Sequence, residues 1–150
     1  MKDRPPKLTA GKIARLLRDK HWQYDHICVK ECGVGCRNGE PGRRLDFLAM
    51  KRSHTSPTLF GYEIKINRQD FTNDAKWEDY LEYCNCFYFV CPDDLIDPDE
   101  LPSEVGLIYV TYVEKWGKFR LEKVRDAVHR PIEPPVGLFV SILINRFKGD

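Results

Sequence analysis

Residues 60–71, FGYEIKINRQDF, decide how this chain is expected to fold, and they place two charged side chains within an apolar strand. Side chains alternate between the two faces of a strand, so Phe60 and Tyr62 point to one face. Glu63 and Lys65 point to the other, with their Cα atoms about 6.5–7 Å apart. A surface salt bridge on a solvated sheet face is the ordinary explanation of such a pair. Residues elsewhere in the chain give this pair a second explanation.

Composition indicates a single globular domain over residues 1–150. Hydrophobic residues make up 42% of the chain and charged residues 31%, which is enough to bury a core. No apolar run approaches the roughly 20 residues of a membrane span, and residues 1–12 lack a signal-peptide pattern. We therefore expect a cytoplasmic protein that does not contact membranes. The net charge of +1 excludes a uniformly basic coat for nucleic acid, but not a local basic patch.

Apolar periodicity and turn residues predict the order α-β-β-β-α-β, followed by a hairpin and a final helix. The first helix is expected to begin after Thr9, which is a suitable N-cap. The expected elements are a helix over 10–20, strands over 24–31, 43–51 and 58–67, a helix over 72–84, a strand over 87–91, a hairpin of 106–113 with 118–124, and a helix over 136–147.

Asp46 lies in the middle of the strand that precedes the opening segment, between Leu45 and Phe47. Asp is a poor strand former, so its position in an apolar strand indicates a role other than packing. If the two strands pair through the loop at 53–58, Asp46 lies beside Glu63. Two carboxylates on adjacent strands can hold a hard cation such as Mg²⁺ through oxygen ligands.

The order and spacing of these polar residues resemble a known nuclease signature. Asp46, followed after sixteen residues by Glu63-Ile64-Lys65, resembles the D-x(n)-E-x-K pattern of the PD-(D/E)XK nuclease superfamily. The resemblance implies a catalytic set of Asp46, Glu63 and Lys65. It implies Mg²⁺, with Mn²⁺ as a substitute, bound by both carboxylates and the main-chain carbonyl of Ile64. Lys65 would orient the attacking water, stabilise phosphate charge or accept a proton.

A second, more specific resemblance lies in residues 62–92, YEIKINRQDFTNDAKWEDYLEYCNCFYFVCP, which are similar to the MmcB-like DNA repair proteins. It covers about residues 43–92 and extends loosely to Val113. It implies an α/β fold with a restriction-endonuclease-like αβββαβ core, a mixed sheet flanked by helices, then the hairpin and helix. Leu45 stands where many members have proline. The first helix lacks the glutamate that some members use as an extra metal ligand, for which Glu31 is a candidate substitute.

Three arginines are candidate DNA contacts. Arg43 and Arg44 precede the strand of Asp46 and either follow a phosphate backbone or form a solvated strand end. Arg68 follows the motif and is either a phosphate contact or an ion-pair partner of Asp70. The sequence leaves these alternatives open.

The helix expected over 72–84 contributes further candidates. Lys76 and Tyr80 are four residues apart and share a face of that helix. Lys76 is a candidate contact to phosphate or water there, with Tyr80 beside it. Trp77 points about 100° away and is expected in the core.

Six cysteines in a chain without a secretion signal are expected to be reduced thiols or metal ligands. They form two groups, Cys28, Cys32 and Cys36, and Cys84, Cys86 and Cys91. Neither group has a usual zinc spacing, and Cys84 and Cys91 are expected to be small buried residues.

The sequence therefore favours a Mg²⁺-dependent DNA endonuclease or nickase that acts in DNA repair or processing. The alternative is a nucleic-acid-binding module that keeps the fold without cutting, and a role in RNA or protein interaction is the third reading. The intact set of Asp46, Glu63 and Lys65 favours the enzyme. The sequence does not distinguish DNA from RNA, a single-stranded from a double-stranded or branched substrate, or nicking from a double-strand cut. It also leaves open the sequence specificity and the oligomeric state, for which a homodimer is one option.

Overall fold

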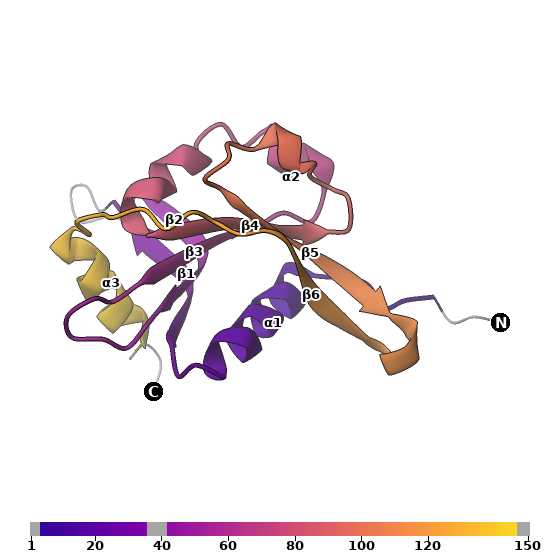
Figure 1. The fold of residues 1–150 in the computed structure, drawn as a ribbon, viewed down its shortest axis with the longest axis horizontal. Coiled ribbons are helices and arrows are strands. Elements are labelled where there is room, and N and C mark those ends of the chain that lie inside the picture. Colours follow the sequence, from indigo (N-terminus) through magenta and orange to yellow (C-terminus); the bar gives the residue numbers. More distant parts are fainter. Residues whose placement is uncertain (1–3, 36–41, 147–150) are drawn as a thin grey trace.

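The computed structural model describes residues 4–35 and 42–146, which form a six-stranded mixed sheet with helices on its faces (Figure 1). The strands are β1 Ile27–Val34, β2 Arg43–Met50, β3 Leu59–Ile64, β4 Cys86–Pro92, β5 Gly106–Val113 and β6 Lys118–Arg125. They lie in chain order across the sheet. β3, β4 and β5 run parallel to one another, and the other neighbours are antiparallel.

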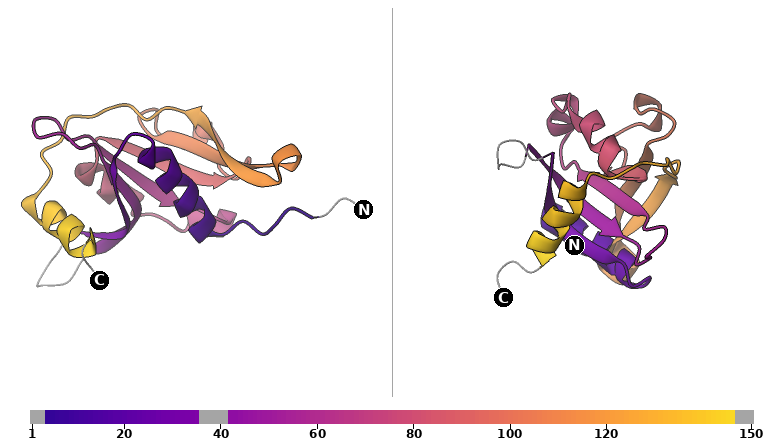
Figure 2. Two further views of the ribbon diagram at one scale, coloured as in Figure 1. Left: turned by 90° about the horizontal axis from the view of Figure 1, so that it is seen from below. Right: turned by 90° about the vertical axis from the view of Figure 1, so that its left-hand side faces the viewer.

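Within residues 4–35 and 42–146, three α-helices and three short 3-10 helices connect and cover these strands. They are α1 Ala10–Trp22, α2 Arg68–Thr72, η1 Trp77–Tyr83, η2 Pro98–Glu100, η3 Glu114–Trp116 and α3 Val136–Arg146. Figure 2 shows α1 on one face of the sheet and α3 near its β1 edge. Within the described ranges, no helix is both long enough and apolar enough to cross a membrane.

Two core clusters lie against the sheet, so both faces are largely covered. Leu17 of α1 packs in one cluster with Tyr62. Tyr83 of η1, Phe87 of β4 and Ile142 of α3 belong to the other. The charged face of β3 therefore points into the second cluster and not into solvent, because that face also carries buried residues of β4.

Most elements lie where the sequence predicts them. The hydroxyl of Thr9 accepts the amide of Lys12 at 3.2 Å, which confirms the N-cap of α1. Residues 86–91 of β4 are all buried, as expected of a continuous apolar strand between covered faces. β5 and β6 form the predicted hairpin, and Gly117 ends its 3-10 turn with a φ of 62°. The closing helix is present as α3.

The prediction of one α-helix over residues 72–84 is wrong. α2 ends at Thr72, and the chain turns before η1 begins at Trp77. Two contacts with β2 hold this segment in the tighter form. Arg43 donates to the carbonyl of Lys76 at 3.1 Å, and the hydroxyl of Tyr80 donates to the carbonyl of Arg44 at 2.9 Å. Apolar spacing shows that this stretch covers the sheet, but it does not separate α from 3-10 winding.

The cysteines of the described ranges are free thiols: Cys28, Cys32, Cys84, Cys86 and Cys91. Cys84 and Cys91 have no exposed surface, as predicted. Burial raises the pKa of the Cys84 thiol to about 12. Cys36, part of the first predicted group, lies outside the described residues.

Candidate active site

The alternation of side chains along β1 changes phase opposite the Asp46 position. Val29 and Cys32 are three residues apart, yet both belong to the same core cluster. Between them, Glu31 has a left-handed φ of 47°. Lys30 pairs with Phe47 and Cys32 with Leu45, so Glu31 stands opposite Asp46. The irregular backbone therefore coincides with the row of candidate acidic residues.

Asp46 and Glu63 face each other across β2 and β3 and bind each other's strand. Phe47 pairs with Tyr62, so Asp46 is opposite Glu63 one step further along. The amide of Asp46 donates to Glu63 Oε1 at 3.2 Å, and the amide of Ile64 donates to Asp46 Oδ2 at 2.7 Å. Each carboxylate thus accepts a hydrogen bond from a main-chain amide of the neighbouring strand. These contacts confirm that the two side chains lie side by side.

Burial and mutual repulsion make both carboxylates costly to ionise. Glu63 is 6% exposed. Burial, followed by the charge of Asp46, raises the pKa of Glu63 to about 8. Burial also raises the pKa of Asp46, with smaller upward contributions from Glu31 and Asp74. Hydrogen bonds from the facing amides and the charge of Lys65 act in the opposite direction on both groups. An additional positive charge at this point would offset the repulsion.

Lys65 is buried beside the pair and is held by an acidic residue that the sequence reasoning missed. Its Nζ donates to Asp74 Oδ2 at 2.6 Å and lies 3.8 Å from Glu63 Oε2. The other carboxylate oxygen of Asp74 accepts the amide of Lys76 at 3.1 Å, which fixes Asp74 in the turn before η1. Glu63 and Lys65 do lie near each other, but the prediction that they form a surface salt bridge is wrong, because the lysine is only 8% exposed.

The raised pKa of Glu63 predicts how stability depends on pH. The folded protein keeps a proton on Glu63 that the unfolded chain has released, so stability falls as pH rises from about 4.5 to about 8. We expect Glu63→Gln to have about the wild-type free energy of unfolding at pH 5. At pH 9 the variant should be more stable by about 2–4 kcal/mol. Gln keeps an oxygen to accept the amide of Asp46.

Urea denaturation of the wild type, of Glu63→Gln and of the exposed control Glu78→Gln at both pH values measures this effect. Equal responses of the two variants to pH would contradict the raised pKa of Glu63.

The donor set fits a hydrated divalent cation better than a fully protein-bound one. Asp46 and Glu63 provide the hard oxygen ligands that Mg²⁺ prefers, and each has one oxygen engaged by an amide. In the part of the chain that the structure describes, no three His, Cys, Asp or Glu side chains form a group that could hold a metal ion. Mg²⁺ commonly uses one or two carboxylates together with water and substrate phosphates, which two facing carboxylates suit.

Two of the predicted DNA-contact arginines already have acidic partners. Arg43 forms an ion pair with Asp79 of η1 at 2.7 Å. Arg68 forms a two-pronged ion pair with Glu100 and donates to the carbonyl of Leu95 at 2.9 Å. The ion pair considered between Arg68 and Asp70 is therefore wrong. The side chains of Asp70 and Asn67 bind each other instead.

Arg44 and Lys76 are exposed, and within residues 4–35 and 42–146 their side chains form no ion pair. Tyr80 is buried, so Lys76 and Tyr80 do not share a face as predicted for an α-helix. Burial, then the charges of Glu63 and Asp46, raises the pKa of Tyr80. Trp77 stacks on Phe87, which confirms its predicted packing role.

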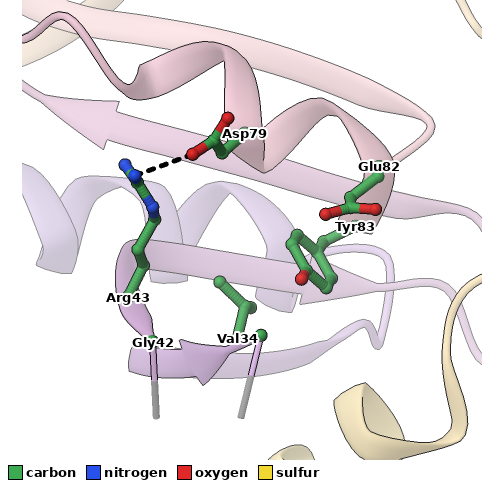
Figure 3. Close-up of a pocket in the computed structure, with 7 residues that line it drawn as sticks. Val34, Gly42, Arg43, Asp79, Glu82 and Tyr83 are labelled. Atoms are coloured by element: carbon green, nitrogen blue, oxygen red, sulfur yellow. Dashed lines mark ion pairs between the residues drawn. The ribbon is translucent and has the colours of Figure 1, made fainter. Parts of the chain in front are cut away.

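A cavity of about 400 Å³ lies at the end of the β1–β2 pair, beneath η1 (Figure 3). Arg43, Asp79, Glu82 and Tyr83 line it, and the ion pair of Arg43 with Asp79 crosses one side. None of the predicted catalytic residues lines this cavity. This cavity is therefore separate from the candidate carboxylate pair.

The fold and site define a mixed α/β protein in which the half-buried Asp46 faces the buried Glu63, with the buried Lys65 beside them. The chain belongs to the family of MmcB-like DNA repair proteins, which it matches over residues 7–136. The family suggests a role in DNA repair, and the match confirms the resemblance of residues 62–92 to the MmcB-like proteins.

A solved structure gives a second comparison. A protein of unknown function from Silicibacter pomeroyi is similar, with 27% identity and a TM-score of 0.63, over 97% of this chain and 86% of that one. This similarity supports the mixed α/β fold with its six-stranded sheet. No curated protein matches the chain.

Proposed function

We propose that the protein is a metal-dependent DNA endonuclease or nickase whose reacting centre is formed by Asp46, Glu63 and Lys65. The observation that carries this proposal is the buried pairing of Asp46 with Glu63. Two carboxylates are placed in contact with each other's strand, and burial opposes the charge of both. Such an arrangement costs stability, and a cation-binding role explains why it is present.

Asp46 and Glu63 would hold the cation, with the carbonyl of Ile64 as a further ligand. A bound Mg²⁺ would supply a water of lowered pKa and positive charge against the scissile phosphate. The protein would position that phosphate and exclude bulk water. Glu63 and Lys65 are buried, and η1 packs against β3, which supports this enclosure.

Lys65 would donate a hydrogen bond to phosphate or to the attacking water. Its Nζ is directed at Asp74 and lies near Glu63, so it is within reach of the acidic pair. Asp74 would keep the ammonium group oriented until substrate arrives. This makes Asp74 a positioning residue.

DNA would approach over Arg44 and Lys76, whose exposed charges are free of acidic partners in the described ranges. Contact by Arg43 or Arg68 would require the ion pairs to Asp79 or Glu100 to open. Phosphate contacts of this kind add affinity without sequence preference and weaken as salt is added.

The second candidate function is a DNA-binding module that does not cut. It is favoured by the engagement of Lys65 with Asp74, and by the lack of a three-ligand metal group among the described residues. Both candidates predict DNA binding, but only the first predicts hydrolysis.

A substrate panel separates the two. Wild-type protein is incubated with single-stranded, duplex, mismatched and branched DNA and with RNA, in Mg²⁺, in Mn²⁺ and in chelator. The proposal expects metal-dependent cleavage of at least one substrate. Binding without cleavage of any substrate would leave the binding module, and neither binding nor cleavage would remove both candidates.

A further inference from the structure

Two large aromatic side chains that are not part of the acidic pair are exposed at the end of α1 and just beyond it. Trp22 is 73% exposed and Tyr24 is 67% exposed. The ring of Tyr24 lies 5.7 Å from the ring of His26 and so is held on one side. Exposed aromatic rings of this size can stack against flat ligands. Proteins that bind single-stranded nucleic acid use such rings as platforms on which the bases stack.

Beside these rings the surface has two adjoining hollows of about 80 Å³ and 230 Å³. Arg18 of α1, Cys28 of β1 and Arg146 of α3 line both of them. Trp22, Asp25, His26 and Arg52 complete the smaller hollow, and Tyr24 lies beside it, next to His26. Because the two hollows share Arg18, Cys28 and Arg146, they form one groove between α1, β1 and α3. Figure 2 shows α1 and α3 near the β1 edge of the sheet.

Positive charge is concentrated in this groove. Arg18 and Arg146 form no ion pair within the described ranges. Asp25 is the acidic residue that lines the groove, and its charge is paired with Arg52. Arg52 donates a hydrogen bond to the carbonyl of Asp25 at 2.9 Å and forms an ion pair with its carboxylate at 3.4 Å. Burial raises the pKa of the Cys28 thiol, and the charges of Arg18 and Arg146 act against that rise.

We propose that this groove, with Trp22 and Tyr24 as stacking platforms and Arg18 and Arg146 as phosphate contacts, binds single-stranded DNA. The choice of DNA rests on the proposed function. The choice of a single strand rests on the rings, because bases within a duplex do not present their faces for stacking.

The groove is lined by β1, and Asp46 of the acidic pair lies on the neighbouring strand β2. Cys28 lines the groove, and Glu31, opposite Asp46, comes three residues later, or about 10 Å along the strand. A single strand held in the groove would therefore pass close to the candidate reacting centre. The groove would hold the unpaired part of a DNA substrate beside the part to be cut.

The test measures binding of the full chain to a labelled oligothymidine of about 16 nucleotides, and to a duplex of equal length, by fluorescence anisotropy in chelator. Trp22→Ala is expected to weaken binding to the single strand about tenfold or more, and Trp22→Phe should restore most of the loss. The matched control is Trp116→Ala, at the exposed turn of the β5–β6 hairpin. It should bind as the wild type does.

A second pair of variants tests the phosphate contacts. Arg18→Ala should weaken binding and reduce the dependence of affinity on salt, whereas Lys118→Ala, which removes an equal charge from the hairpin, should not. The proposal is overturned if Trp22→Ala binds the single strand like the wild type, if the duplex binds as tightly as the single strand, or if no DNA binds. Because all measurements are made without metal, absence of cleavage would count against the proposed hydrolysis and not against the groove.

Discussion

Replacing Asp46 with Asn is expected to reduce cleavage by about a thousandfold while the protein stays folded. The amide oxygen of Asn can still accept the hydrogen bond from Ile64, which the wild-type carboxylate receives at 2.7 Å. The contact between β2 and β3 is thereby kept. What is lost is a negative charge that a cation needs. The measurement is a single-turnover cleavage rate in Mg²⁺, with Asp99→Asn on an exposed turn as the matched control.

The same variant should bind DNA in chelator as well as the wild type does, or more tightly. Glu31, Asp46 and Asp74 place negative charge where a phosphate must approach, and Lys65 offsets only part of it. Removing one charge lowers that repulsion. Weaker binding by Asp46→Asn, with its fold intact by circular dichroism, would mean that Asp46 supports a DNA-binding surface and not a metal.

Replacing Lys65 with Met has the second large expected effect, a loss of cleavage of about 10²–10⁴-fold. Met keeps the length and apolar stem of the lysine but cannot donate a hydrogen bond. Asp74 and Glu63 both lose a buried positive neighbour, so the variant should also unfold at lower denaturant concentration. Lys115→Met, in the exposed turn of the hairpin, is the control for the loss of a lysine.

Asp74→Asn separates these two effects of Lys65. It weakens the ion pair, and so should lower stability, but it leaves the ammonium group in place. We expect this variant to lose no more than about tenfold in cleavage. If Asp74→Asn loses as much activity as Lys65→Met, the role of Lys65 lies in holding the fold, and Lys65 is removed from the reacting centre.

The sequence predicted the sheet and the facing carboxylates because local patterns determine both. The alternation of side chains along the strand predicted the face to which Glu63 points. The short loop between β2 and β3 predicted their antiparallel pairing, which places Asp46 opposite Glu63. Residues 87–91 were recognisable as a strand covered on both faces from their unbroken apolar run, and the observed strand is Cys86–Pro92. The parallel neighbours of this strand follow from connections long enough to cross over.

Burial of the acidic pair and the partner of Lys65 could not be predicted from the sequence in the same way. The role of Asp74 depends on a turn between α2 and η1, in a stretch whose apolar spacing predicts one continuous α-helix. Nothing in the sequence indicates the left-handed backbone of Glu31, because glutamate rarely adopts that conformation. Arg68 meets Glu100 across more than thirty residues, a contact that only the fold creates.

The central claim is that Asp46 and Glu63 form a metal-dependent hydrolytic site. It is tested most directly by the single-turnover cleavage rate as a function of Mg²⁺ concentration, on the best substrate of the panel, for the wild type and for Asp46→Asn. The account predicts a wild-type rate that rises to saturation with Mg²⁺ and vanishes in chelator, and a variant rate lower by about a thousandfold at every concentration. Cleavage that persists in chelator, or an Asp46→Asn rate equal to that of the wild type, would contradict it.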